Sequence, residues 1–124
     1  MSGGNIAQVR TIFNNKTKYS LRLENYHESQ GHFNIYPPKD ILPYSEVEWK
    51  TENNPASLTG TEASCVYVFY DNDTKYELLF EWDVPLIGSN SFGAHYSPKR
   101  NGLNLTFDNP SGYFVVWHCE FTEN

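Results

Sequence analysis

The sequence is poor in basic residues, poor in cysteine and free of long apolar runs. Lys and Arg number 9 against 15 Asp and Glu, which gives a formal net charge of −6. Nucleic-acid affinity depends mainly on basic side chains that neutralise phosphates, so this charge balance excludes a DNA- or RNA-binding protein. The same balance argues against attachment to anionic lipids through a polybasic patch.

Cys65 and Cys119 are too few for a disulfide-based scaffold. Both lie on apolar faces of predicted strands, so they could form a bond, but synthesis in the cytoplasm favours two free buried thiols. No segment reaches the roughly 18 consecutive apolar residues that a membrane-spanning helix requires. The first ten residues lack the charged region and apolar run of a signal peptide. We therefore expect synthesis in the cytoplasm and extracellular action, on target-cell membranes, only after release.

Aromatic residues are abundant, with 3 Trp, 9 Tyr and 8 Phe making up 16% of the 124 residues. Aromatic enrichment favours β-strands over helices, and it excludes a disordered chain. Tyr and Trp also suit interfaces, because one end of each ring is apolar and the other can stay hydrated. The composition therefore predicts a folded, strand-rich protein.

Apolar and polar residues alternate with period two through most of the chain, whereas helical periodicity is almost absent. In the run 76–82, for example, Tyr76, Leu78, Phe80 and Trp82 share one face. Turn residues interrupt these runs about every ten residues, as at 14–16 and 71–73, which is typical of a sandwich or barrel. We count eight or nine strands and predict that residues 1–124 form a single-domain, all-β antiparallel β-sandwich.

No group of residues predicts an active site or a metal centre. His118 and Cys119 are adjacent, but neighbours in a strand point to opposite faces and cannot share a proton. The Asp71-Asn72-Asp73 segment lacks further oxygen ligands and is interpreted as a hairpin turn. None of the four histidines has a partner at metal-site spacing: they are His27, His32, His95 and His118. We therefore expect a binding protein rather than an enzyme, with no metal or cofactor.

Apolar residues near predicted turns are the best binding candidates. Trp82 ends a predicted strand and precedes a loop in which Leu86 and Ile87 have no evident core to fill. Aromatic rings favour the headgroup region of a bilayer, and they also stack on sugars. The alternative is that a sandwich so rich in rings packs them in its core. We single out five candidates for contact with a lipid or receptor: Trp49, Trp82, Leu86, Ile87 and Tyr96.

Three segments match motifs of a known family in their order and spacing. They are Asn14-Asn15-Lys16-Thr17 before Leu21-x-Leu23-Glu24, then Thr59-Gly60-Thr61-Glu62, then Phe80-Glu81-Trp82-Asp83-Val84-Pro85 before Gly88-Ser89-Asn90-Ser91-Phe92. Over residues 9–96 the chain resembles the aegerolysins, and its length also fits the small component of Bacillus binary insecticidal crystal toxins. Two departures are Ala63, where a glycine is usual, and Leu86, where fungal members carry a tryptophan.

The resemblance implies an actinoporin-like β-sandwich that binds membranes and acts with a larger pore-forming partner of the perforin-like or crystal-toxin type. The protein would then recognise a lipid or glycoconjugate and recruit that partner. This is the role of the small component of a two-component haemolytic or insecticidal toxin. Two alternatives stay open, a soluble lectin-like protein that binds glycans and a homodimer joined through the apolar loop.

Overall fold

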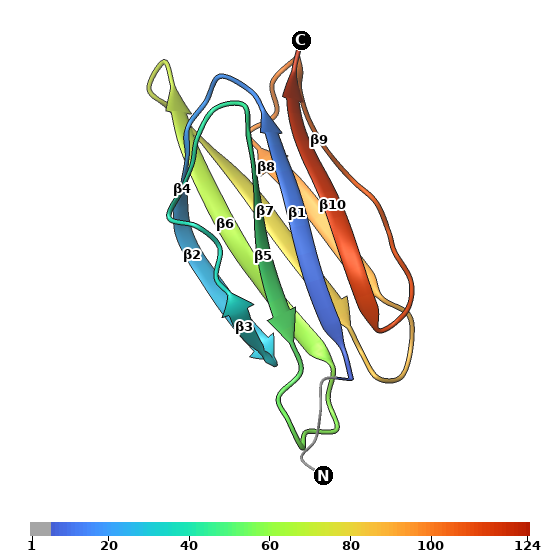
Figure 1. Cartoon of the computed structure of the whole chain (residues 1–124). Helices are drawn as coiled ribbons and strands as arrows, with labels where there is room; N and C mark the ends of the chain where they lie inside the picture. Colours follow the sequence, from blue (N-terminus) through green and yellow to red (C-terminus); the bar gives the residue numbers. More distant parts are fainter. Residues whose placement is uncertain (1–5) are drawn as a thin grey trace.

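Two five-stranded sheets pack face to face in the computed structural model, which describes residues 6–124 (Figure 1). The described residues contain ten strands and no helix. The strands are β1 (Gln8–Lys16), β2 (Leu21–Gln30), β3 (His32–Ile35), β4 (Asp40–Ile41), β5 (Ser45–Glu52), β6 (Thr61–Asp71), β7 (Thr74–Val84), β8 (Ser91–Ser97), β9 (Leu103–Phe107) and β10 (Phe114–Glu123). The sequence predicted eight or nine, because β4 has two residues and shows no alternation.

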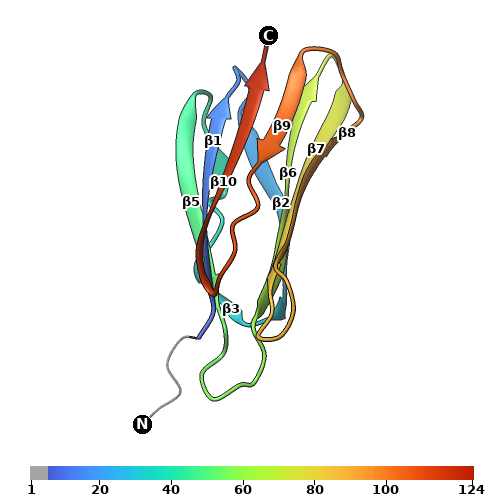
Figure 2. The same cartoon turned by 90° about the vertical axis from the view of Figure 1, so that its right-hand side faces the viewer.

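The first sheet has the order β3-β5-β1-β10-β9 and the second the order β4-β2-β6-β7-β8. Figure 2 shows the two sheets from the side, and the buried apolar side chains lie between them. β1 and β10 run parallel in the middle of the first sheet, whereas the other strand pairs of residues 6–124 are antiparallel. The predicted all-β sandwich is confirmed, with one parallel pair inside a mainly antiparallel arrangement.

The strand register gives the sandwich two distinct ends. Gln8 pairs with both Phe114 and Glu52, so the start of β1, the start of β10 and the end of β5 lie together. The loops 53–60, 85–90 and 108–113 gather at this end, which is the lower end in Figure 1 and which we call the apolar end. Loops 17–20, 42–44, 72–73 and 98–102 gather at the opposite end.

Aromatic rings fill most of the space between the sheets. Trp49, Trp82 and Trp117 are at most 2% exposed. Phe13 of the first sheet meets Phe80 of the second edge to face, with their ring centroids 4.9 Å apart, which is a favoured geometry for aromatic pairs. The composition that predicted strands therefore also supplies the core.

The two turn predictions at 71–73 and 14–16 have different outcomes. Asn72 and Asp73 have positive φ angles of 50° and 64° and join β6 to β7, as a two-residue hairpin requires. The prediction of a turn at 14–16 is wrong, because β1 continues to Lys16. The carboxamide of Asn15 is buried and donates hydrogen bonds to the carbonyls of Tyr19 and Leu42. A polar residue is thus satisfied inside the strand that it was expected to end.

Candidate functional site

Large apolar side chains are exposed at the tips of two loops of the apolar end. Leu58 is 91% exposed in loop 53–60, and Ile87 is 93% exposed in loop 85–90. Single exposed apolar residues are common, but these two lie at the same end of the sandwich. Ile6, Tyr113 and Phe114 add partly exposed apolar surface at the same end.

The loop after β7 is built so that Leu86 faces inward and Ile87 faces outward. Val84 is fully buried at the end of the strand, and Leu86 is half-buried against the core. The Tyr113 hydroxyl donates a hydrogen bond of 2.9 Å to the Leu86 carbonyl. Gly88 follows with φ +106°, a conformation that side chains rarely adopt. The backbone therefore reverses directly after Ile87 and leaves its side chain at the tip.

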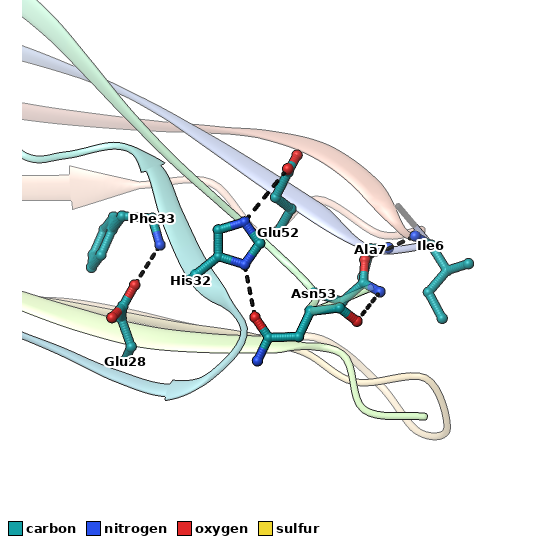
Figure 3. A network of polar contacts seen from close by, with 8 residues as sticks. Ile6, Ala7, Glu28, His32, Phe33, Glu52 and Asn53 are labelled. Carbon is teal, nitrogen blue, oxygen red and sulfur yellow. Dashed lines mark hydrogen bonds and ion pairs between the residues drawn. The ribbon is translucent and has the colours of Figure 1, made fainter. Parts of the chain in front are cut away.

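The base of the loop that carries Leu58 is fixed by Asn53, as Figure 3 shows. The buried Asn53 Oδ1 accepts hydrogen bonds from the backbone N–H groups of Ile6 and Ala7, at 2.8 and 3.1 Å. Its Nδ2 donates to the carbonyl of Asn54. A buried carboxamide with this many partners holds its backbone firmly, so Leu58 extends from a rigid base.

A second network of polar contacts links β2, β3 and β5 beside that loop (Figure 3). The Glu28 carboxylate accepts a 2.6 Å hydrogen bond from the Phe33 N–H. His32 lies 2.8 Å from Asn54 Oδ1 through Nδ1, and 3.7 Å from Glu52 Oε1 through Nε2. These contacts connect the two sheets at the apolar end.

Three of the five predicted contact residues need correction, because their side chains lie in the core. Trp49 is fully buried, and Trp82 is 2% exposed and donates its indole N–H to Thr51 Oγ1 at 2.9 Å. Tyr96 is 6% exposed, and its hydroxyl lies 2.8 Å from the Leu103 carbonyl, near the opposite end. The same rings that suit an interface are used here to fill the sandwich.

The remaining two predicted residues belong to the apolar end, with different exposures. Leu86 packs partly against the core, whereas Ile87 stands free. Sequence reasoning missed Leu58 and Phe114. The signal for Leu58 was an isolated leucine in a loop rich in Asn, Pro and Ser. For Phe114 the signal was the alternation along β10, in which Val115 faces the core and is buried, whereas Phe114 faces outward and is 63% exposed.

An acidic groove lies on the outer face of the second sheet, next to the apolar end. It has a volume of about 390 Å³ and includes Glu62, Glu81 and Asp83 in its lining. No basic side chain of residues 6–124 lies within ion-pair distance of these carboxylates. Partial burial raises the pKa of Asp83 above its usual value. Among the described residues the groove therefore carries three carboxyl groups and one histidine, His95, and its surface is mainly acidic.

The cysteines show no feature of reactive thiols. Cys65 and Cys119 are free and buried, and burial raises the pKa of both well above the usual value. A thiol held in its protonated form is a poor nucleophile and a poor metal ligand. His118, next to Cys119, points outward to Asp108 at 3.2 Å. Among residues 6–124 no three His, Cys, Asp or Glu side chains are grouped closely enough to hold a metal ion.

In the part of the chain that the structure describes, no helix has the length and apolar character needed to cross a bilayer.

Known proteins resemble this chain in sequence or in structure. No family model matches the chain. An uncharacterized protein of Dictyostelium discoideum is 29% identical over 102 residues, which are 82% of this chain and 9% of that protein. The chain thus spans less than a tenth of the length of this curated relative.

Solved structures match almost the whole chain. The lipid-binding protein Nakanori superposes with a TM-score of 0.83 at 11% identity, covering 97% of this chain and 73% of its own. RahU, solved in complex with TRIS, gives a TM-score of 0.76 at 15% identity, covering 98% of both chains. IP-1A from Alcaligenes faecalis gives 0.73 at 16% identity, covering 97% of this chain and 93% of its own. The chain therefore has the β-sandwich fold of these proteins, in agreement with the fold that the aegerolysin resemblance implies.

Proposed function

We propose that the protein binds lipid membranes through the apolar end of the sandwich. The observation that carries this proposal is the pair of loop tips, where Leu58 and Ile87 are almost fully exposed on rigid bases. Transfer of each such side chain out of water contributes about 1.5–3 kcal/mol. With the exposed Phe114 added, the three side chains contribute about 4.5–9 kcal/mol before the cost of association is subtracted, so attachment of a single molecule should be weak and reversible. The fold of a lipid-binding protein, Nakanori, supports the same proposal.

The charge next to these tips favours neutral lipid surfaces. Glu62, Glu81 and Asp83 would lie close to the headgroups when the tips are inserted. Anionic lipids would then be repelled, whereas zwitterionic lipids would not. Since insertion rather than charge provides the affinity, binding to zwitterionic membranes should survive high salt.

Co-sedimentation with zwitterionic vesicles at low and high salt tests the proposal. The variant Leu58→Ser/Ile87→Ser should lose binding by at least tenfold, because it removes both inserted side chains. The matched control is Leu42→Ser/Tyr70→Ser, which removes two side chains that are each 65% exposed near the opposite end. Equal binding by both variants, or no binding by the native protein to any lipid mixture, would overturn the proposal. Light scattering over a range of concentrations tests the alternative in which Ile87 joins two copies.

The resemblance to aegerolysins supports a more specific role. We propose that the membrane-bound protein recruits a larger pore-forming partner, of the perforin-like or crystal-toxin type, as the small component of an insecticidal two-component toxin acting on the outer surface of target cells. Dye-loaded vesicles should then stay intact with this chain alone and leak when the partner is added. Leakage caused by the chain alone would contradict a recruiting role.

A further inference from the structure

A second groove, of about 420 Å³, separates the loop 85–90 from the loop 108–113 at the apolar end. Asn90 links the two loops that border the groove, because its Nδ2 donates hydrogen bonds to the carbonyls of Pro110 at 3.2 Å and Gly112 at 2.9 Å. Phe92 is part of the lining and packs on the buried Trp117, with ring centroids 5.1 Å apart. The groove is therefore preformed, which lowers the cost of binding a small ligand.

The lining of this groove contains no charged side chain. It combines the rings of Phe92 and Tyr113 with the hydroxyl or carboxamide groups of Ser89, Asn109 and Ser111. An uncharged lining gives no counter-charge to a phosphate group, and it places several hydrogen-bonding side chains next to two aromatic rings. Hydroxyls and carboxamides both donate and accept hydrogen bonds, so they match a ligand that carries several hydroxyls.

The polar groups that point to the groove also have free hydrogen-bonding capacity. The Oδ1 of Asn90 has no partner among residues 6–124, because both contacts of this side chain run through Nδ2. Ser89, Asn109 and Ser111 make no side-chain hydrogen bond within the described part of the chain, and Ser89 and Ser111 are exposed. Such groups can bond to a ligand without breaking an existing contact.

We propose that this groove binds one neutral sugar unit. The apolar C–H face of the sugar ring packs on Phe92 and Tyr113, and its hydroxyls bond to Ser89, Asn90 and Asn109. The sugar could be free, part of a soluble glycan or the headgroup of a glycolipid. The proposal does not rest on membrane binding, because the groove and its lining are complete in the protein alone.

The test is a titration of the ¹⁵N-labelled intact protein with glucose, galactose, mannose, N-acetylglucosamine and N-acetylgalactosamine in the absence of lipid. At least one sugar should give saturable shifts at the amides of residues 88–92 and 109–113, with the millimolar affinity usual for a small ligand with few contacts. Absence of saturable shifts with all five sugars, or shifts confined to other residues, would overturn the proposal.

A variant pair separates this groove from the rest of the surface. Ser89→Ala/Asn109→Ala removes two exposed polar groups from the lining and should weaken sugar binding about tenfold. Ser97→Ala/Asn101→Ala makes equivalent changes at exposed positions near the opposite end and should bind sugar like the native protein. Equal sugar affinity in the two variants would contradict the assignment.

The source of the sugar is decided with vesicles. Vesicles that carry the same sugar as a neutral glycolipid should bind the protein more tightly than plain zwitterionic vesicles, and free sugar should compete. Sugar binding in solution without this gain on vesicles supports the groove and assigns it to soluble glycans. A gain on glycolipid vesicles that neither free sugar nor Ser89→Ala/Asn109→Ala reduces would overturn the groove as the site.

Discussion

The two ends of the sandwich use their side chains differently. At the opposite end, Arg100 is held by Asp71 and by the Tyr19 hydroxyl, and its guanidinium lies 5.5 Å from the centre of the Tyr19 ring and 5.7 Å from that of Tyr76. At the apolar end, Leu58 and Ile87 extend into solvent from well-bonded loops. The opposite end therefore pairs its charged groups, although Leu42, Tyr44 and Tyr70 are also 65–69% exposed there. The apolar end carries the two most exposed apolar side chains of the described residues, at 91% and 93%. This difference in exposure supports the proposal that membrane binding uses the apolar end.

The largest expected effect comes from Gly60, which fixes the loop that carries Leu58. A Cβ at this position would lie 1.9 Å from the carbonyl oxygen of Val84, so Gly60→Ala must displace backbone. We expect a loss of about 3 kcal/mol in the free energy of unfolding, measured with urea. At Gly102, at the opposite end, an added Cβ would meet no atom within 4 Å, and only the φ angle of +89° disfavours a side chain. We therefore expect Gly102→Ala to lower the free energy of unfolding by about 1 kcal/mol. Equal losses would show that the two loop bases do not differ in rigidity.

The next effect concerns the acidic groove beside the apolar end. Glu62→Gln/Glu81→Gln removes two negative charges and should raise affinity for vesicles containing phosphatidylserine about tenfold. Affinity for purely zwitterionic vesicles should hardly change. The control Glu46→Gln/Asp73→Asn removes two exposed charges nearer the opposite end and should have no effect on either membrane. A gain in both double variants would mean that net charge, rather than its position, controls binding.

A smaller effect is expected in the cluster at the opposite end. The hydrogen bonds from the Tyr19 hydroxyl and from the Arg100 guanidinium lower the pKa of Asp71. A carboxyl group whose pKa is lowered by folding stabilises the folded protein at pH values above the pKa that the group has in the unfolded chain. This stabilisation is lost as the pH falls through the pKa that the group has in the folded protein. Tyr19→Phe should lower the Tm by roughly 2–5 °C at pH 7 and by less below about pH 4. Vesicle binding at pH 7 should be unchanged, and a loss of binding would place part of the site at this end.

The smallest expected effect is in the native tryptophan emission. Trp49, Trp82 and Trp117 are already buried, so vesicle binding should leave the emission maximum where it is. A tryptophan introduced by Ile87→Trp should shift to the blue on binding, because it enters the bilayer interface. Leu42→Trp, at the opposite end, should not shift. A blue shift of the native protein would mean that core rings rearrange on the membrane.

The fold could be predicted from the sequence, whereas most of the site could not. Alternation shows which residues share a strand face, and the packing of apolar faces then requires two sheets. It does not show which rings become core, because Trp49 and Trp82 look equally suited to a wet interface. Their burial depends on contacts between residues far apart in sequence, such as the bond from Trp82 to Thr51. The exposure of Ile87 could be predicted, because it depends on the sequence of its own short loop.

Local rules also failed where a long-range contact outweighed them. Asn15 carries the signature of a turn, but its carboxamide reaches Leu42, 27 residues away, and stays inside β1. The apolar end could not be predicted for the same reason. Leu58 and Ile87 form one exposed apolar surface only because the strand register brings their two loops to the same end. A pattern read along the chain cannot supply that register.

The parallel pairing of β1 with β10 has a consequence for the way in which this protein folds. The first strand lies between β5 and β10, and its register with β10 joins Gln8 to Phe114 and Lys16 to Thr122. Closing a loop of this length is entropically expensive, so folds dominated by such distant contacts form slowly. During synthesis, one edge of β1 stays unpaired until residues 114–123 have left the ribosome. Over that interval the exposed edge is a template for pairing with other chains, so the yield of folded protein should depend on how quickly the last strand arrives.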